Sequence, residues 1–467
     1  MSALHLSVAE FRSLAARMTD LSAQLLTGLG RARAFPVVSG AQTEQAFAAP
    51  LSEEGLGAHA LDALKEVLAL SRAPTPRFYG YVLGSGEPVA ALADLLASVL
   101  NQNVTAWRSA PAAVTIERQL VRGLAGALGC EGFGGSLCGG GSMANLMGLA
   151  MAREAQLPAN ERGARPGVVY ASSEVHMSIP KAIALLGLGR ENLRLIEADQ
   201  DFRLNVRALR EAIAADRAAG RMPFAVVASA GTVNTGAIDP LEEIAAVCRD
   251  EQLWLHVDGA YGALAALAVP GAFAGLASAD SLSLDAHKWL YQPLDCGMLL
   301  YRSATAARAA FSFTGDYAKS LATDPVEGFA FFDQSLELSR RFRALKLWLS
   351  LRYHGLAAFR NAIRADLEHA RELAAAISAT RELELLAPLE LSAVCFRHRP
   401  TSAAQDADAL NAAILRRLIA RGRVYLSNAS IRGQFALRAC FVNHRTTNED
   451  VAQIVPEVLE AAREVKA

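Results

Sequence analysis

The stretch that decides the fold of this protein is SLSLDAHKWL, which spans residues 281–290. Its opening run, Ser281–Leu284, predicts a short buried β-strand. Lys288 follows His287 just beyond the end of that strand. A lysine in such a place is, taken alone, most often a solvent-exposed surface residue. The surrounding sequence therefore decides whether Lys288 has a chemical role.

Short β-rich runs recur on both sides of this stretch and alternate with segments of helical periodicity. The other predicted strands are Val168–Ala171, Leu193–Glu197, Phe224–Ser229, Trp254–Asp258 and Cys296–Tyr301. The predicted helices among them are Ile179–Leu188, Val206–Ala219 and Pro240–Asp250. This alternation is typical of an α/β fold, in which helices cover both faces of a mostly parallel central sheet.

Two smaller regions flank the alternating segment. Residues 7–29 and 60–70 have helical periodicity, and residues 35–55 predict an extended arm between them. This opening region is too small to bury a core alone, so we expect it to pack on another domain or on a partner subunit. After Arg340 a long helical stretch leads into a smaller α+β region. We therefore predict three parts, residues 1–87, 88–345 and 346–467.

The composition excludes several classes of protein. Of the 467 residues, 52% are hydrophobic, and 46 Lys and Arg nearly balance 47 Asp and Glu. Because there is no excess positive charge, neither a nucleic-acid partner nor a polybasic membrane contact is expected. The sequence has no signal-peptide pattern and no apolar run of about 18 residues, which predicts a cytoplasmic protein. Its six cysteines are widely spaced without a CxxC pair, which predicts buried thiols and no metal site.

A glycine-rich run, GGGSMAN, begins at Gly139 and opens an amphipathic helix. Three glycines allow a ligand to approach the backbone closely, and the first amides of a helix bind anions. The hydroxyl of Ser142 adds a donor to this predicted anion site. The run lacks the lysine of a nucleotide-binding P-loop. Taken alone, it is also compatible with a simple loop in which Ser142 caps the helix.

Two further residues follow predicted strands. Asp258 ends the β run of LWLHVDGAYGA, where a buried carboxylate needs a cationic partner such as a protonated pyridine nitrogen. His176 lies after another strand, in YASSEVHMSIPKA, where its imidazole can stack on a planar ring. Each of them alone could equally be structural. Together with Lys288 and the glycine run they provide an amine, a carboxylate, a stacking ring and an anion cradle, which predicts a pyridoxal 5′-phosphate (PLP) site.

The sequence resembles the group II pyridoxal-dependent decarboxylases, a family that includes the aromatic-L-amino-acid, glutamate and histidine decarboxylases. Within this family it is most similar to the bacterial branch of the aromatic-L-amino-acid decarboxylases. The resemblance is strongest over residues 76–343. It rests on TPRFYGYV (75–82), SAPAAVTIE (109–117), GGGSMANLMGLAMAR (139–153), SSEVHMSIPKA (172–182), GTVNTGAIDPLEEI (231–244), HVDGAYG (256–262) and DAHKWL (285–290).

The resemblance implies a role for each matching residue. Lys288 matches the lysine that forms a Schiff base with PLP, His176 the residue stacked on its ring, and Asp258 the partner of its pyridine nitrogen. The other residues expected around the coenzyme are Gly141, Ser142, Thr232, Ala260 and His287. The resemblance also implies the aminotransferase-like fold type I and an obligate homodimer with active sites at its interface, clasped by the N-terminal helices.

Tyr317, in FTGDYAKSLATDPVEGF (313–329), decides the expected reaction. In similar decarboxylases the corresponding loop tyrosine reaches over from the partner subunit and protonates the substrate carbon after carbon dioxide leaves. Members with phenylalanine at this position resemble aldehyde synthases instead. The presence of tyrosine therefore favours simple decarboxylation, although a solvent-facing loop tyrosine remains the alternative.

The sequence departs from the family at two places. The usual Asn-Pro-His-Lys is Asp285-Ala286-His287-Lys288 here. Because an acidic side chain repels a phosphate, we expect the Asp285 carboxylate to face elsewhere, toward an arginine or a backbone amide. The substrate pocket is expected to include Phe78, Tyr79, Asn103 and Thr105. The last two are small and polar where animal aromatic decarboxylases have large apolar side chains.

These observations predict a PLP-dependent decarboxylase that converts an L-amino acid, most readily an aromatic one, into its amine. Decarboxylation of glutamate, aspartate, diaminobutyrate or another polar amino acid is the first alternative, because of the polar Asn103 and Thr105. An aldehyde synthase or a carbon–carbon lyase on the same fold is the second. A non-catalytic dimeric binding protein is the alternative outside enzymes.

Overall fold

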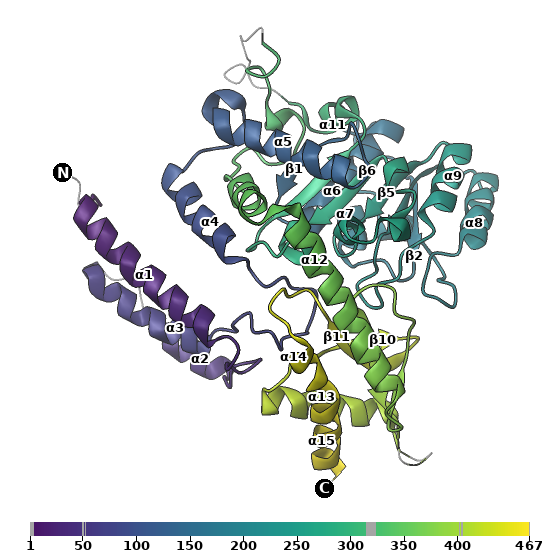
Figure 1. The fold of residues 1–467 in the computed structure, drawn as a ribbon. Coiled ribbons are helices and arrows are strands. Elements are labelled where there is room, and N and C mark those ends of the chain that lie inside the picture. The colour runs from purple at the N-terminus through teal and green to yellow at the C-terminus, as the bar shows by residue number, and fades with distance from the viewer. Residues whose placement is uncertain are drawn as a thin grey trace.

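The computed structural model describes residues 4–48, 51, 53–313, 324–400, 402 and 405–466. A large sheet covered by helices forms the main body, and a smaller sheet with its own helices lies beside the C-terminal half of the long helix α12 (Ala344–Ser378). Three N-terminal helices stand apart from both (Figure 1). Among the described residues, no helix combines the length and the apolar character needed to cross a membrane.

The large sheet has seven strands in the order β1-β7-β6-β5-β4-β2-β3. Only β7 runs antiparallel to its two neighbours, so the sheet is mostly parallel as predicted. The strands are β1 (Gly134–Cys138), β2 (Val168–Ser172), β3 (Leu193–Ile196), β4 (Pro223–Ser229), β5 (Trp254–Asp258), β6 (Ser281–Asp285) and β7 (Gly297–Tyr301). All six predicted strands are confirmed. Strand β1 was not predicted, because GGSLC contains no β-branched or aromatic residue.

Both faces of this sheet are buried. In β2, Val169 and Ala171 pack with helices on one face, whereas Val168 and Tyr170 belong to the core on the other face. Successive side chains of a strand point to opposite faces, so a strand covered on both faces is apolar throughout. The helices around the sheet are α4 (Pro88–Leu100), α5 (Pro111–Ala127), α6 (Gly141–Gln156), α7 (Ser178–Leu185), α8 (Val206–Ala218), α9 (Leu241–Glu251), α10 (Ala286–Trp289) and α11 (Ala304–Phe311).

The register of the sheet brings distant parts of the sequence together at one edge. Asp258 pairs with Ser229 on one side and with Ser283 on the other, where β4, β5 and β6 approach their carboxyl ends. Across the antiparallel strand β7, Gly297 pairs with both Asp285 and Cys138. The ends of β1, β5 and β6 therefore lie at one edge, and the segments that follow them emerge there together.

The smaller sheet is antiparallel, in the order β10-β11-β9-β8. Its strands are β8 (Leu383–Leu385), β9 (Ala393–His398), β10 (Ser427–Ile431) and β11 (Gln434–Cys440). The helices packed with it are α13 (Ala407–Arg421), α14 (Asn448–Ala452) and α15 (Ile454–Lys466). This α+β arrangement agrees with the prediction for the C-terminal region.

Helices α1 (Val8–Gly28), α2 (Gly40–Phe47) and α3 (Leu64–Leu70) form an N-terminal arm. The extended arm predicted for residues 35–55 is wrong in part, because α2 occupies its middle. The Ser39 hydroxyl accepts a hydrogen bond from the Gln42 amide, and the Gln42 side chain accepts one from the Ser39 amide. These two reciprocal hydrogen bonds stabilise the N-terminus of α2. The polar residues around it obscure the helical pattern in the sequence, so this helix was not predicted.

Candidate active site

A cavity of about 500 Å³ opens at the edge of the sheet where these strands end. Residues from the β1–α6, β2–α7, β5 and β6–α10 segments line it. The cavity thus brings together seven of the residues singled out from the sequence: Gly141, Ser142, His176, Asp258, Ala260, His287 and Lys288. The predicted amine, carboxylate, imidazole and glycine loop therefore share one space, although their roles remain to be tested.

The glycine loop leads from β1 directly into α6. Gly140 has φ +138°, a conformation that favours glycine, and a Cβ on Gly141 would lie 2.6 Å from the Cβ of Ala260. Within the part of the chain that the structure describes, no side chain caps the N-terminus of α6, and Ser142 at its start is exposed. The loop therefore leaves room, free amides and a hydroxyl group at the positive end of a 16-residue helix. These are the donors that a phosphate group requires.

Lys288 lies on the other side of this loop, one helical turn after Asp285. Its Nζ is 2.9 Å from Asp285 Oδ2, and His287 Nε2 is 3.4 Å from the same oxygen. His287 Nδ1 accepts a hydrogen bond from the Cys296 amide. Burial lowers the pKa of His287, so its imidazole is neutral.

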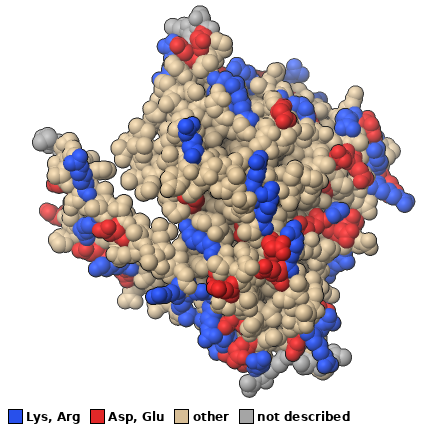
Figure 2. All heavy atoms as spheres, in the orientation of Figure 1, with Lys and Arg blue, Asp and Glu red and all other residues tan. Residues whose placement is uncertain are grey.

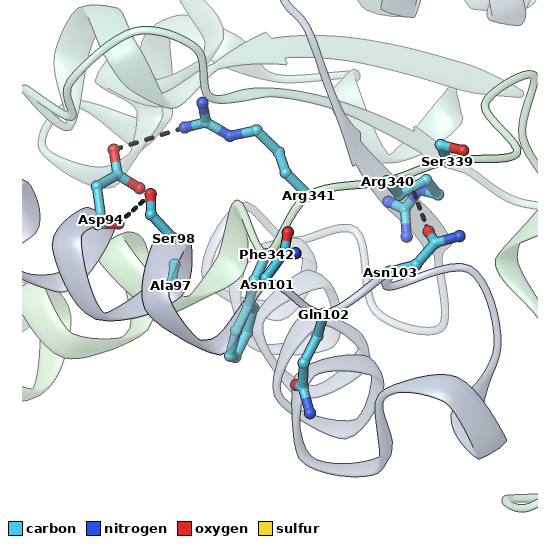
Figure 3. Close-up of a pocket in the computed structure, with 10 residues that line it drawn as sticks. All are labelled: Asp94, Ala97, Ser98, Asn101, Gln102, Asn103, Ser339, Arg340, Arg341 and Phe342. Atoms are coloured by element: carbon cyan, nitrogen blue, oxygen red, sulfur yellow. Dashed lines mark hydrogen bonds and ion pairs between the residues drawn. The ribbon is translucent and has the colours of Figure 1, made fainter. Parts of the chain in front are cut away.

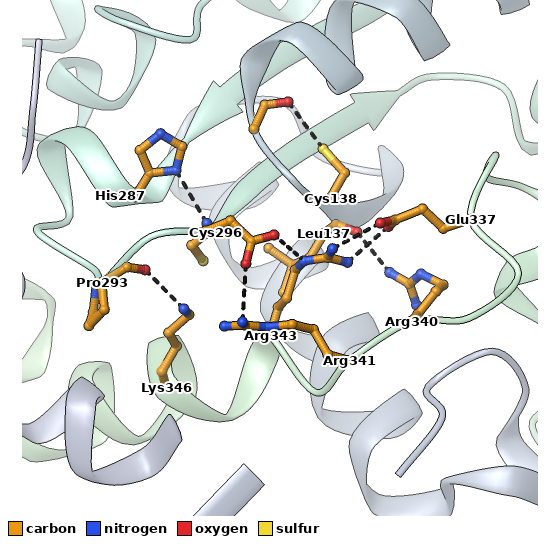
Figure 4. Close-up of polar contacts among 12 residues, drawn as sticks. Leu137, Cys138, His287, Pro293, Cys296, Glu337, Arg340, Arg341, Arg343 and Lys346 are labelled. Carbon is orange, nitrogen blue, oxygen red and sulfur yellow. Dashed lines mark hydrogen bonds and ion pairs between the residues drawn. The ribbon is translucent and has the colours of Figure 1, made fainter. Parts of the chain in front are cut away.

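The expectation that Asp285 faces an arginine or a backbone amide is wrong. Its carboxylate lines the cavity, because the lysine at i+3 supplies the positive charge that the prediction sought elsewhere. The nearby Arg343 is already paired with Glu337 and Asp295 (Figure 4). The structure thus places a carboxylate inside the predicted anion cradle.

Asp258 is held by a hydrogen-bond network that the sequence did not predict. Its Oδ1 accepts from the Ala260 amide and the Ser283 hydroxyl, and its Oδ2 accepts from Asn145 Nδ2 at 2.9 Å. Asn145 Oδ1 is 2.9 Å from His256 Nε2. Asn145, from α6, therefore connects Asp258 to a buried histidine of β5.

The donors in this network can be assigned from one end to the other. The Asp258 carboxylate can only accept, so Asn145 donates to it through Nδ2 and Asn145 Oδ1 is left to accept from His256 Nε2. Nδ1 of the neutral ring therefore accepts from the Ser281 hydroxyl, which itself accepts from the Trp254 indole. His256 then carries its proton on Nε2 and donates it to Asn145 Oδ1. Burial lowers the pKa of His256 to about 4, so the ring stays neutral. Both N–H groups of Asn145 are left to donate to Asp258 and to Ser178.

The same network determines the tautomer of His176. Ser178 Oγ accepts from Asn145, and both the hydroxyl and the amide of Ser178 lie within hydrogen-bond distance of His176 Nδ1. Nδ1 is therefore an acceptor, and the proton of the neutral ring is on Nε2. Burial lowers the pKa of His176, which favours this neutral form. His176 thus offers the cavity a flat ring with an N–H donor.

The signal for these missed residues was present in the sequence. His256, Ser281 and Ser283 are polar residues on strands that are buried throughout. Buried polar groups require partners, so each of them pointed to a hydrogen-bond network. Asn145 lies within the quoted glycine motif, but only the packing of α6 on β5 shows what it contacts. A Cβ on Gly148 would lie 2.5 Å from the His256 ring, which shows how closely α6 packs there.

Other predicted residues lie elsewhere in this chain. Thr232 is buried, and its hydroxyl bonds to Thr235 and to the Ala237 amide rather than lining the cavity. Phe78 stacks on Tyr425 with ring centroids 4.4 Å apart, and Tyr79 packs on Phe441. Neither of these two aromatic residues lines the cavity.

The two predicted polar pocket residues lie outside the Lys288 cavity of their own chain. Asn103 lines a separate pocket, where its Oδ1 accepts from the Arg340 amide at 2.8 Å (Figure 3). The Thr105 carbonyl accepts from the Phe331 amide. Tyr317 lies outside the described residues. The roles of these three residues remain predictions.

The residues present in the cavity fit PLP. The cradle has space only because its loop lacks side chains, an amine lies beside it, and the buried Asp258 can still accept a hydrogen bond from the cavity. In the part of the chain that the structure describes, no group of three His, Cys, Asp or Glu side chains could hold a metal ion. The fold and this donor set together define a fold type I enzyme that uses PLP.

Comparison with known proteins agrees. Residues 52–399 match the family described as the pyridoxal-dependent decarboxylase conserved domain, and this chain belongs to that family. It is 38% identical to the aromatic-L-amino-acid decarboxylase of Bacillus atrophaeus (84% of this chain, 82% of the relative). It is 30% identical to the phenylacetaldehyde synthase of Petunia hybrida (92% and 89%). The crystal structure of Oryza sativa TDC with PLP and tryptamine superposes with a TM-score of 0.92 at 27% identity, covering 99% of both chains.

The Asn145 network can be tested directly. Asn145→Ala removes the partners of Asp258 Oδ2, His256 and Ser178, so we expect turnover to fall by on the order of 10-fold, the scale found for residues that orient a ligand. Stability should also fall by about 1–3 kcal/mol, because buried polar groups lose their partners. Turnover and thermal unfolding of the PLP-loaded protein measure the two effects.

Asn411→Ala is the matched control for this variant. Asn411 is fully buried in α13 and makes three backbone hydrogen bonds with residues 398 and 407, in the smaller α+β region. It should lose comparable stability with unchanged turnover. Equal turnover in the two variants would show that Asn145 has only a structural role.

Proposed function

We propose that this member of the decarboxylase family converts aromatic L-amino acids into carbon dioxide and the corresponding amines. The observation that supports this substrate class is the lining of the Lys288 cavity. Apart from Asn145, Asp285 and the polar residues assigned to the coenzyme, the side chains that line it are apolar or aromatic: Val82, Leu83, Met143, Val233, Tyr261 and Leu294. Among the described lining residues, Lys288 is the only lysine or arginine.

This lining disfavours an acidic substrate. The side-chain carboxylate of glutamate or aspartate would need a cationic or strongly donating partner when it is buried. Burial lowers the pKa of His176 and of His287, which favours their neutral imidazoles. Lys288 is required for the coenzyme. An aromatic side chain needs no charged partner and gains from burial against the apolar wall.

Each residue then has a defined task. Bound PLP supplies an aldehyde that condenses with amines and a ring that accepts the electrons left when carbon dioxide departs. Lys288 provides the amine that holds the coenzyme and later releases the product amine. Asp258 keeps a proton on the ring nitrogen, because three hydrogen bonds fix its carboxylate in place. His176 would lie against the ring, and Tyr317 would deliver a proton to the substrate carbon.

The first experiment is a visible spectrum of the purified protein, followed by amine detection across the common L-amino acids. We expect the absorbance of a lysine-bound coenzyme, and amine from Trp, Tyr or Phe. Lys288→Ala should lose both. Amine from Glu or Asp alone would overturn the substrate class. Absence of the band after PLP is added would overturn the assignment of Lys288 and its cavity to the coenzyme.

Tyr317 distinguishes decarboxylation from aldehyde formation, which matters because the similar proteins include both kinds of enzyme. In Tyr317→Phe the carbon is no longer protonated efficiently, so oxygen can react instead. We expect amine to decrease, and aldehyde, ammonia and hydrogen peroxide to appear in equal amounts with one oxygen molecule consumed. Product analysis with an oxygen electrode measures this change. Unchanged amine yield would remove Tyr317 from the reaction.

We also propose that the protein is a homodimer. Helix α4 exposes five large apolar side chains, Leu92, Leu95, Leu96, Val99 and Leu100. The surface in this region has few charges in Figure 2, and the N-terminal arm stands away from the body beside it (Figures 1 and 2). Contiguous exposed apolar surface of this kind marks a contact site. A second copy of this chain is its proposed occupant.

Sedimentation should therefore give twice the chain mass of 49.6 kDa. Leu96→Asp places a charge in the proposed contact, so we expect it to shift the protein to the monomer and lower activity. Leu195→Asp, at an exposed leucine on the edge strand β3, should change neither. A monomeric wild-type protein would contradict the proposed assembly.

A further inference from the structure

The unexplained feature of the cavity is the carboxylate of Asp285 inside the anion cradle. The residue is 3% exposed, and its Oδ2 is paired with Lys288. Its Oδ1 is fully buried, and no residue that the structure describes forms a hydrogen bond with it. A Cβ on Gly141 would lie 3.1 Å from Oδ2, and one on Gly140 would lie 3.8 Å from Oδ1. An acceptor without a donor therefore faces the loop proposed to hold the phosphate.

The neighbouring charges do not satisfy this oxygen. The titratable and charged groups around Asp285 are Lys288, His287, His176, Asp258, Asp295, Cys138, Cys296, Arg343 and Lys346. Arg343 pairs with Glu337 and Asp295, and the Lys346 ammonium donates to Asp94 and to the Pro293 carbonyl. Of these described groups, Lys288 and His287 are the ones that approach the Asp285 carboxylate, and both approach Oδ2.

A phosphate monoester reaches this cradle in one of two forms. Its second pKa is about 6, so above neutrality it is mainly a dianion that can only accept hydrogen bonds. A dianion beside Asp285 would leave Oδ1 without a donor and add repulsion between like charges. The singly protonated form carries one P–O–H group, which is the donor that Oδ1 lacks. The proton belongs on the phosphate, because a carboxyl group is the stronger acid.

We propose that this site binds the coenzyme phosphate as its singly protonated monoanion, with the P–O–H group donating to Asp285 Oδ1. The inference rests on the proposed position of the phosphate at Gly139–Ser142. Loading at a pH above 6 then takes up one proton from solvent. Condensation of the Lys288 ammonium with the aldehyde would release water and keep one positive charge on nitrogen, so it would take up no proton itself. Any proton taken up at the ring nitrogen beside Asp258 is common to the wild type and the Asp285 variants, so the difference between them reports the phosphate.

The consequence is a pH-dependent affinity. Above the second pKa of the phosphate, the singly protonated PLP that the site accepts becomes tenfold scarcer in solution with each pH unit. The Kd for PLP should therefore rise nearly tenfold per pH unit. Asp285→Asn replaces the acceptor with an amide of the same shape, whose N–H donates to the dianion. We expect this variant to bind PLP at least tenfold more tightly than wild type at pH 8, with a shallower dependence on pH.

Phosphorus NMR of the PLP-loaded protein reports the protonation state of the bound phosphate directly. We expect the wild-type resonance at the position of the singly protonated ester, unchanged between pH 6.5 and 8.5, with the free coenzyme titrated as the reference. In Asp285→Asn it should lie at the position of the dianion. Sulfate, which carries no proton at neutral pH, should compete with PLP in the variant and only weakly in the wild type.

Asp280→Asn is the matched control. Asp280 is a partly buried carboxylate just before the other end of β6, where it accepts a hydrogen bond from the Leu255 amide. It should leave the resonance and the pH slope unchanged. Asp285→Ser provides a second variant that also lacks the carboxylate. Equal resonance positions and slopes in wild type and both Asp285 variants would overturn the proposal. Failure of the wild type to show a lysine-bound coenzyme would instead overturn the proposed function.

Discussion

The alignment of strand ends at one edge of the large sheet is the constraint on which the rest of the site depends. Gly297 packs so tightly against Gly140 that a Cβ there would lie 2.3 Å from the Gly140 Cα. This contact fixes the end of β1 against β7, and β7 against β6. Because β6 carries Asp285 at its end, the glycine loop and Lys288 meet although about 150 residues separate them. No single segment of the chain could form this cavity alone.

Much of this arrangement could be predicted because buried parallel strands leave a clear pattern. The strands that end at Asp258 and Asp285 are short, fully buried segments rich in leucine and valine, and residues placed at or just after their ends fall at the same edge. Strand β1 escaped prediction because it begins with two glycines, Gly134 and Gly135, and a Cβ on Gly135 would lie 2.2 Å from the Leu299 carbonyl oxygen of β7. The close packing that places β1 beside the site therefore also excludes the residue types by which a strand is recognised in a sequence.

Other features depend on contacts that no local pattern encodes. The orientation of Asp285 was predicted from repulsion by a phosphate, but its nearest charge is the Lys288 ammonium at 2.9 Å. The partners of Asn145 depend on how α6 lies on the sheet. The role of Tyr317 depends on a second subunit and remains a prediction. The substrate-pocket roles of Phe78, Tyr79, Asn103 and Thr105 and the three-part division of the chain also remain predictions.

The two carboxylates of the cavity differ in how far the protein satisfies them. Asp258 accepts three hydrogen bonds of the roughly four that a carboxylate can accept, and a neutral, fully bonded network supports it. It is left with capacity for one strong donor, which suits a protonated ring nitrogen. Among the described residues, Asp285 has a charged partner on one oxygen and no partner on the other. The protein thus fixes one carboxylate firmly and leaves the second dependent on its ligand for a proton. Since a buried acceptor without a donor is costly, the fold itself favours a ligand that brings that proton into the cradle.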